Sequence, residues 1–307
     1  HRKNGVNSMP QVAQQQKVNP GTTKIEGHLL VKCVDQSGIV SKLSTFLYTH
    51  GANIVESSQY SNDPEGGMFF IRLAYHIDHQ EAVMTKMEQD FKELVEDYQM
   101  SYQFYYPTIK KRAAIFVSKD LNCLMELLWE WKNGDLLMDI PLIISNNEAA
   151  RNIAEIHNIP FYYIPANKEI RAQVEQQQIE LLEKYDIDFI VLARYMQILT
   201  PQFVAHFEHR IINIHHSFLP AFIGADPYSR AHKRGVKLIG ATSHYVTNDL
   251  DEGPIIEQDV ERVDHRDDVA SLKKIGGKIE RRVLARAVRW HLENRIIVEG
   301  NKTIVFH

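Results

Sequence analysis

Cysteine is scarce in this sequence, and no long hydrophobic run is present. Only Cys33 and Cys123 occur among the 307 residues, too few for a disulfide framework or a cysteine-based zinc site. No apolar stretch approaches the roughly 18 residues that span a bilayer, and the first residues lack the apolar core of a signal peptide. We therefore expect a soluble, cytoplasmic protein that has no membrane partner.

Neither sign of charge is in large excess. The chain contains 35 Lys and Arg residues against 39 Asp and Glu residues, a formal net charge of −4. This balance provides no general attraction to nucleic acid, so we expect no nucleic-acid partner. The length leaves room for about two domains, each with its own buried core.

Residues 1–24 are polar and rich in Gln and Asn, which predicts a disordered tail. From residue 25 to residue 106 the hydrophobic pattern is regular. It predicts strands over 28–34, 52–61, 68–76 and 100–106, and helices over 39–51 and around 83–95. The resulting β-α-β-β-α-β order is the ferredoxin-like split βαβ arrangement.

The segment 107–112 predicts a linker, and residues 113–307 then alternate between apolar strands and helices. The expected strands include 113–118, 141–145, 188–193 and 210–214. Their continuous apolar character indicates an α/β, Rossmann-like domain with a mostly parallel open sheet. In the helical pattern over 267–294, Gly276 and Gly277 each cost about 1 kcal/mol relative to Ala, which predicts a break into two helices.

Two separate segments carry most of the chemistry. Asn213 and His215 lie two residues apart at the end of a predicted strand, so their side chains point to the same side. An amide beside an imidazole suits acyl chemistry, because the amide can stabilise an oxyanion while the imidazole moves a proton. The second segment begins at His244 and ends in a turn that carries Asp249, Asp251 and Glu252.

Taken singly, these residues also have plainer interpretations. A lone histidine at a strand end is more often structural than catalytic, and an Asp-Glu-Gly-Pro turn is commonly just exposed. His215 and His216 are adjacent on a strand and face opposite ways, so we expect no metal site there. His206 and His209 are expected on a solvated helix face.

Together the segments resemble the folate-dependent formyltransferase fold. The pattern is Asn213-x-His215, then Ser-x-Leu-Pro, then Leu-Asp-x-Gly-Pro, with 38 residues from Asn213 to Asp251. The resemblance implies that Asn213, His215 and Asp251 are catalytic. It also implies that the segments 191–199 and 247–251 form the walls of the pterin site. The folate-binding residues it implies are Met196, Gln197, Leu199, Thr247 and Asp249, with His244 as a lesser candidate for positioning Asp251 or water.

The first domain indicates which family with this fold the chain resembles. The turn Asp35-Gln36-Ser37-Gly38-Ile39 resembles that of ACT domains, and an ACT-like domain before a formyltransferase-like domain is the arrangement of formyltetrahydrofolate deformylases. The resemblance implies hydrolysis of 10-formyltetrahydrofolate to tetrahydrofolate and formate, which balances folate pools and supplies formate for purine synthesis. No cofactor beyond this substrate is implied.

The same turn suggests a second ligand. A helix N-terminus behind Gly38 leaves free N–H groups that suit a carboxylate, so an amino-acid effector is expected at Asp35, Ser37, Gly38 and Ile39. The plainer interpretation is a simple helix cap. Because ACT-like sheets commonly pair across subunits, we also expect a homo-oligomer.

The acceptor of the formyl group is indicated by the turn 118–124, which contains no glycine. Side chains there would hinder a close approach of phosphate, which favours water over a ribonucleotide. Asn122 stands where deformylases often have His, and it suits helix capping equally well. Two alternatives stay open: a formyltransferase to an amine, and a non-catalytic, amino-acid-sensing folate-binding regulator.

Overall fold

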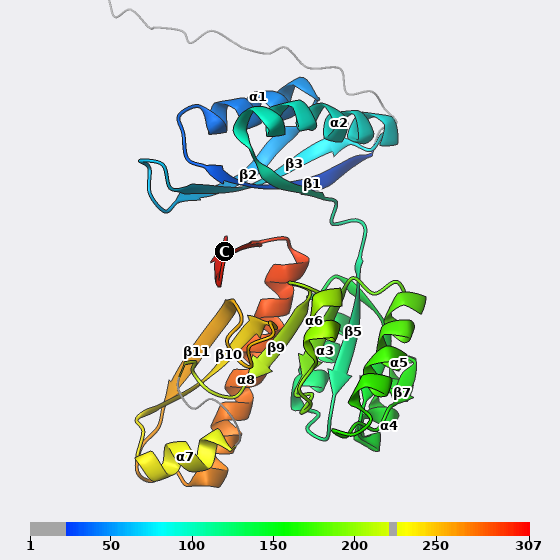
Figure 1. Cartoon of the computed structure of the whole chain (residues 1–307), viewed down its shortest axis with the longest axis vertical. Coiled ribbons are helices and arrows are strands. Elements are labelled where there is room, and N and C mark those ends of the chain that lie inside the picture. The colour runs from blue at the N-terminus through cyan, green and yellow to red at the C-terminus, as the bar shows by residue number, and fades with distance from the viewer. Residues whose placement is uncertain (1–22, 221–225) are drawn as a thin grey trace, which may run out of the picture.

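The computed structural model describes residues 23–220 and 226–307; the predicted tail, apart from its last two residues, lies outside them. The first sheet contains four antiparallel strands in the order β2-β3-β1-β4. Its elements are β1 (Lys24–Val34), α1 (Ile39–Thr49), β2 (Asn53–Ser61), β3 (Met68–Asp78), α2 (Glu81–Tyr98) and β4 (Ser101–Tyr105). Both helices cover one face of the sheet (Figure 1). This is the predicted ferredoxin-like order.

The core of this half lies between the sheet and its two helices. On α1 the buried residues Ile39, Leu43 and Leu47 recur at helical spacing and face the sheet. Phe91 of α2 is fully buried, with its ring centroid 4.8 Å from that of Tyr102 on β4. The apolar periodicity therefore specifies which face of each helix is buried.

The second sheet has seven strands in the order β11-β10-β9-β8-β5-β6-β7. Its strands are β5 (Lys111–Val117), β6 (Met138–Ser145), β7 (Phe161–Tyr163), β8 (Phe189–Ala193), β9 (Ile211–His215), β10 (Leu238–Tyr245) and β11 (Ile255–Arg262). Strands β5 to β9 are parallel, whereas β10 and β11 are antiparallel to their neighbours. The predicted mostly parallel sheet is confirmed.

Helices lie on both faces of this sheet (Figure 1). They are α3 (Asn122–Asn133), the short η1 (Glu148–Ala150), α4 (Arg151–Ile156), α5 (Arg171–Lys184), α6 (Pro201–His206), α7 (Pro227–Arg234) and α8 (Val269–Leu292). One core joins the sheet to α3 and α8, and a second core joins the other face to α5 and α6. Among the described residues, no helix combines the length and apolarity that crossing a bilayer requires.

The predicted break at the glycine pair is wrong, because α8 runs unbroken from Val269 to Leu292. A Cβ at Gly276 would lie 1.9 Å from the hydroxyl oxygen of Tyr228, whereas one at Gly277 would meet nothing within 4 Å. The first glycine therefore permits a close side-chain contact within a continuous helix.

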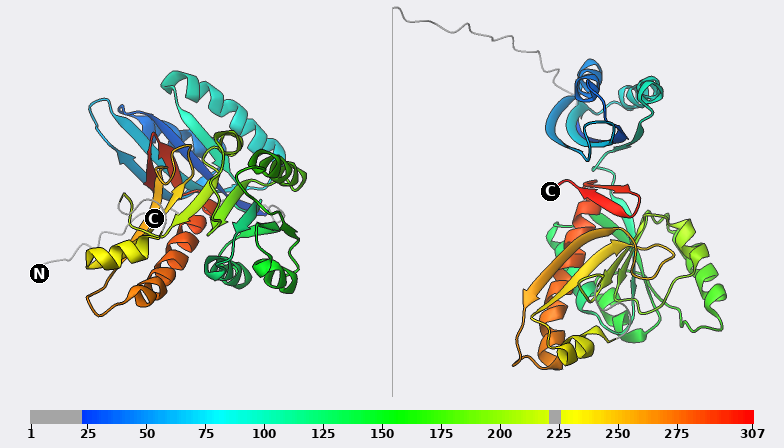
Figure 2. Two further views of the ribbon diagram at one scale, coloured as in Figure 1. Left: turned by 60° about the horizontal axis from the view of Figure 1, so that its bottom comes forward. Right: turned by 60° about the vertical axis from the view of Figure 1, so that its left-hand side comes forward.

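A hairpin that the sequence did not predict links the two halves. It consists of β12 (Ile296–Glu299) and β13 (Lys302–Val305), and it lies between the open face of the first sheet and the end of α8 (Figures 1 and 2). Ile297 and Phe306 pack against Leu30 and Phe70. The buried Arg72 of β3 donates hydrogen bonds to the carbonyl oxygens of Glu293 and Asn294, both at 3.0 Å. Apolar and polar contacts therefore join the two sheets through the C-terminal segment.

Candidate active site

The three residues predicted to be catalytic come together. The Asp251 carboxylate lies 3.3 Å from Nδ1 of His215 and 3.8 Å from Nε2 of His244. The side-chain nitrogen of Asn213 lies 3.3 Å from the same Nε2 of His244. His215 and His244 are buried, and the Asp251 side chain is 9% exposed. An amide, two imidazoles and a carboxylate therefore share one shielded site.

Strand alternation determines which way these side chains point. Ile212 and Ile214 belong to the core beneath α3 and α8. Because successive strand residues face opposite sides, Asn213 and His215 point to the other face of the sheet. His244 pairs with Asn213 across the β9–β10 ladder, so its side chain lies beside them.

The loop after β10 brings Asp251 back over this face. Tyr245 donates a backbone hydrogen bond to the carbonyl oxygen of Pro254 at 2.9 Å. A Cβ at Gly253 would lie 1.7 Å from the Tyr245 carbonyl oxygen, so only glycine fits this close approach. Asp251 itself has a φ of 57°, in the left-handed region. This turn points the Asp251 carboxylate toward the two imidazoles.

The electrostatics favour an ionised Asp251. Burial alone would raise the pKa of this carboxyl group, but its contact with the His244 ring and the charges of His215, His244 and His216 outweigh burial and hold the pKa below its ordinary value. A carboxylate at this position can accept a hydrogen bond from an imidazole or remove a proton from water.

His244 has contacts on both ring nitrogens. Its Nδ1 lies 2.9 Å from the Tyr245 carbonyl oxygen, which can only accept, so Nδ1 carries a proton. In the neutral ring Nε2 then accepts a hydrogen bond from the Asn213 amide. This contact orients the Asn213 amide. It gives His244 a role in addition to the one predicted from the sequence, which was to position Asp251 or water.

The residues predicted to bind folate lie in two loops. Met196, Gln197 and Leu199 follow β8; Met196 is more than half exposed, and its backbone N–H donates to the Ser118 hydroxyl at 3.0 Å. Thr247 and Asp249 lie in the loop after β10, where the Thr247 hydroxyl donates to the Asp249 carbonyl oxygen at 3.4 Å. The first segment follows β8 and the second follows β10, the strands on either side of β9, and their role in folate binding stays a prediction.

Comparison with known proteins agrees with this arrangement. Residues 111–288 match the family model described as formyl transferase, and residues 28–91 match the ACT domain model. The formyltetrahydrofolate deformylase of Bacillus subtilis (strain 168) is 62% identical over 282 residues, which are 92% of this chain and 94% of that protein. This chain belongs to the formyltetrahydrofolate deformylase family.

Solved structures place it within that family and beside a related one. The crystal structure of a formyltetrahydrofolate deformylase from Pseudomonas syringae pv. tomato superposes with a TM-score of 0.88 and 41% identity, covering 94% of this chain and 96% of that chain. Glycinamide ribonucleotide transformylase 1 from Symbiobacterium toebii gives a TM-score of 0.62 and 28% identity, covering 66% of this chain and 97% of that chain. The deformylases therefore match nearly the whole chain, and the transformylase matches about two thirds of it.

In the turn between β5 and α3, the first βα turn of the second sheet, a carboxylate accepts a backbone hydrogen bond. The Asp120 side chain accepts the backbone N–H of Asn122 at 3.0 Å, and Nη2 of Arg194 lies 3.9 Å away. Asn122 is the first residue of α3, and the residue at the N-cap position is Leu121. The suggested capping role of Asn122 is therefore wrong, since Asp120 caps the amide of Asn122 instead.

The residues of the predicted effector turn differ in conformation and exposure, and effector binding there stays a prediction. Gly38 adopts a φ of 92° at the start of α1, as a tight turn there requires. Ser37 and Gly38 are exposed, but Ile39 is buried in the core and the Asp35 carboxylate accepts a hydrogen bond from the Ser61 hydroxyl. Backbone groups, rather than Ile39, would have to bind a ligand here.

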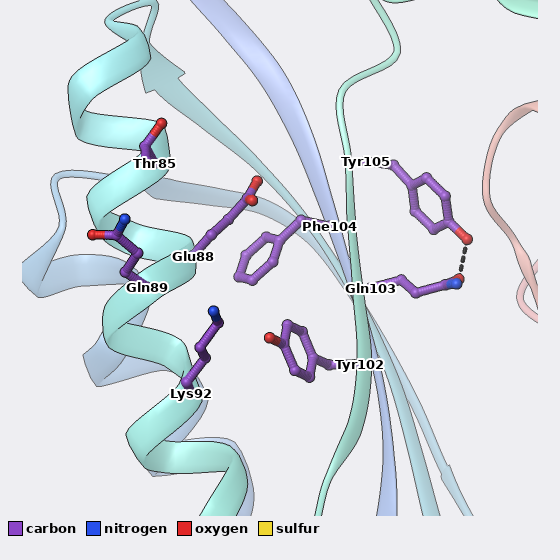
Figure 3. Close-up of a pocket in the computed structure, with 8 residues that line it drawn as sticks. All are labelled: Thr85, Glu88, Gln89, Lys92, Tyr102, Gln103, Phe104 and Tyr105. Atoms are coloured by element: carbon purple, nitrogen blue, oxygen red, sulfur yellow. Dashed lines mark hydrogen bonds between the residues drawn. The ribbon is translucent and has the colours of Figure 1, made fainter.

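Two hollows occur that the sequence did not reveal. One, of about 410 Å³, lies between α2 and β4, where Tyr102 and Phe104 point toward the helix (Figure 3). A larger one, of about 1350 Å³, opens between the first sheet, the linker and the end of α8. Neither is lined by Asn213, His215 or Asp251. Across all described residues, no group of three or more His, Cys, Asp or Glu side chains is arranged to hold a metal ion.

Proposed function

We propose that this protein hydrolyses 10-formyltetrahydrofolate to tetrahydrofolate and formate, with Asn213, His215 and Asp251 as its catalytic residues. The observation that carries the proposal is that the Asn213 amide, the imidazoles of His215 and His244 and the Asp251 carboxylate meet on a single face of the sheet, each within 3.3 to 3.8 Å of a neighbouring partner. Membership of the deformylase family supports the choice of substrate and reaction.

The Asn213 amide stabilises the oxyanion. When water attacks the formyl carbon, negative charge develops on the formyl oxygen. One N–H of Asn213 is held by His244, so the other is available to donate to that oxygen. Loss of such a donor typically lowers kcat by about 10²–10³.

His215 and Asp251 move the protons. Asp251 accepts a proton from the attacking water or holds the imidazolium form of His215, and general-base catalysis of this kind contributes about 10²–10⁴. Protonated His215 then donates to the departing folate nitrogen. Because this nitrogen carries an aryl group, it leaves readily, and the reaction needs no metal ion or cofactor beyond the substrate.

Water is the favoured acceptor of the formyl group. The carboxylate of Asp120 lies at the start of α3, where a phosphate would otherwise meet free backbone N–H groups. Its negative charge disfavours a phosphorylated amine. A formyltransferase is therefore the weaker alternative, and the intact cluster argues against a non-catalytic regulator.

Further parts of the proposal concern the setting of the enzyme. We propose that Met196, Gln197, Leu199, Thr247 and Asp249 line the pterin site, because both loops expose apolar side chains such as Met196 and Leu250. We also propose that an amino-acid effector binds at the turn of Ser37 and Gly38. The chain is further proposed to assemble into a homo-oligomer and to be cytoplasmic.

The deciding experiment is incubation with 10-formyltetrahydrofolate alone, with formate and tetrahydrofolate measured as products. We expect formate in the absence of any amine. Asp251→Asn should lower the rate by about 10²–10⁴ and leave the dissociation constant of the folate nearly unchanged. Glu252→Gln, a change of the neighbouring exposed carboxylate, is the control for the catalytic step. Full activity of Asp251→Asn would reject the assigned role, and no formate from the wild type would reject the reaction.

A further inference from the structure

Three rings form a continuous stack beside the candidate active site, and the prediction that His215 and His216 face opposite ways is wrong, because β9 ends at His215. The ring centroids of His215 and His216 are 5.2 Å apart with an interplanar angle of 28°. Those of His216 and Tyr228 are 5.9 Å apart at 24°. Tyr228 is buried near the start of α7, so the stack leads from the reacting site into the protein interior.

The inner end of this stack is anchored by charge. The Tyr228 hydroxyl donates a hydrogen bond of 2.5 Å to Glu280 of α8, and the other oxygen of Glu280 pairs with Arg194 at 2.7 Å. Glu280 is 4% exposed. Because a buried carboxylate without partners is costly, these two contacts hold its position and with it the tyrosine ring.

Helix α8 has a glycine where the Tyr228 ring approaches it. Gly276 lies so close to Tyr228 that a Cβ would fall 1.9 Å from its hydroxyl oxygen and 2.3 Å from Cζ. The tyrosine ring therefore occupies a space between α7 and α8 that only glycine leaves open.

The middle ring is neutral near pH 7. Burial, together with the charges of Arg194 and His215, lowers the pKa of His216 to about 4, although Asp251 and Asp226 act in the opposite direction. A neutral ring can stack against protonated His215 without charge repulsion. The stack is thus compatible with the proton transfers assigned to His215.

We propose that Tyr228 is a positioning residue, which fixes the orientation of the His215 imidazole through the ring of His216. The inference rests on the proposed function of His215. The anchored ring of Tyr228 limits the tilt of the His216 ring, and the His216 ring limits the tilt of the His215 ring. Small displacements of a catalytic group can lower rates by as much as about 10²-fold.

The adjacent glycines of α8 provide a matched pair for the test. Gly276→Ala places a methyl group against Tyr228 and should lower kcat for deformylation by about tenfold or more, with the KM for 10-formyltetrahydrofolate unchanged. Gly277→Ala changes the same helix by the same group in open space and should retain wild-type kcat. Equal kcat values for the two variants would overturn the proposal.

A second pair tests the ring directly and guards against a folding defect. Tyr228→Phe keeps the ring and loses the hydroxyl anchor, whereas Tyr228→Leu loses the ring. We expect a small loss of kcat for the first and a loss of about tenfold for the second, at thermal midpoints that show both are folded. A Leu variant as active as the Phe variant would contradict the role of the ring.

NMR of the His215 ring nitrogens distinguishes a change in the orientation of this ring from a general loss of structure, and it does not depend on turnover. Long-range ¹H–¹⁵N spectra should show the His215 ring signals, assigned with His215→Asn, shifted in Gly276→Ala and unchanged in Gly277→Ala. Unshifted signals in Gly276→Ala would refute the proposal even if its kcat falls. If the wild type releases no formate but the signals shift, the stack is supported and only the reaction is wrong.

Discussion

At the scale of single residues, the site depends on how closely one loop approaches a strand. Three carboxylates follow β10, and the loop that folds back at Gly253 directs one of them, Asp251, to the imidazoles of His215 and His244. The side chains of Asp249 and Glu252 make no such contact in the structure. The backbone conformation of this loop therefore determines which of the three carboxylates reaches the imidazoles.

This selection leads to a test at Gly253. Gly253→Ala places a methyl group 1.7 Å from the Tyr245 carbonyl oxygen, so the loop must shift and carry Asp251 away from His215. We expect deformylation to fall by about 10²-fold while the domain stays folded. Glu252→Ala, a change of the exposed neighbour, should keep its activity. Kinetics and circular dichroism of both variants check this, and an active, folded Gly253→Ala would show that the loop tolerates displacement.

Alternation along β9 made Asn213 and His215 predictable as a pair, because a two-residue spacing places both on one face. The contact of His244 with Asn213 was not predictable, since it depends on the register of β10 against β9. The same holds for Tyr228 and Glu280, 52 residues apart and joined only through the packing of α7 on α8.

At the scale of elements, apolar periodicity located most strands and the buried faces of α1 and α2. It failed at the glycine pair of α8, because helix propensity acts locally whereas Gly276 accommodates a side chain from α7. It also missed the hairpin of β12 and β13. These strands have four residues each and are mostly half-buried, which gives a weak alternating signal.

The hairpin leads to a prediction about the link between the two sheets. Phe306 is 8% exposed and packs with Leu30, Phe70 and Ile297. Phe306→Ala should remove about 3–5 kcal/mol of local packing and loosen the first sheet from α8. We expect faster limited proteolysis within residues 107–110. Lys302→Ala, at an exposed hairpin position, should be cleaved at the wild-type rate, and equal rates for the two variants would show that the hairpin does not hold the sheets together.

At the scale of the whole molecule, three buried or half-buried histidines make stability depend on pH. Burial lowers the pKa values of His28 and His291 below the ordinary value of 6.5, and His216 has a pKa of about 4. These rings bind a proton more readily in the unfolded chain. Their contribution to stability is therefore present above pH 6.5 and is lost as the pH falls below it. Asp251, whose pKa is lowered from 3.8, loses its contribution only at still lower pH.

The unfolding free energy should accordingly fall between pH 6.5 and 5.5, by about 1 kcal/mol for each histidine that stays neutral in the folded chain over this range. Urea denaturation at pH 7.5, 6.5 and 5.5 measures this. His291→Gln should flatten the dependence, whereas His76→Gln, at an exposed position, should leave it unchanged. A wild-type stability that does not vary over this range would show that these rings take up protons without unfolding.

The length of α8 has a mechanical consequence. At 24 residues it is about 36 Å long, and it bears Glu280 near its middle, while Glu293 and Asn294, which receive hydrogen bonds from Arg72, follow its last turn. The segment that follows the helix is thus hydrogen-bonded to the ACT sheet, and the middle of the helix is hydrogen-bonded to the tyrosine beside the histidines. A ligand that displaces the ACT sheet would therefore act on the same helix that holds the tyrosine beside the candidate active site.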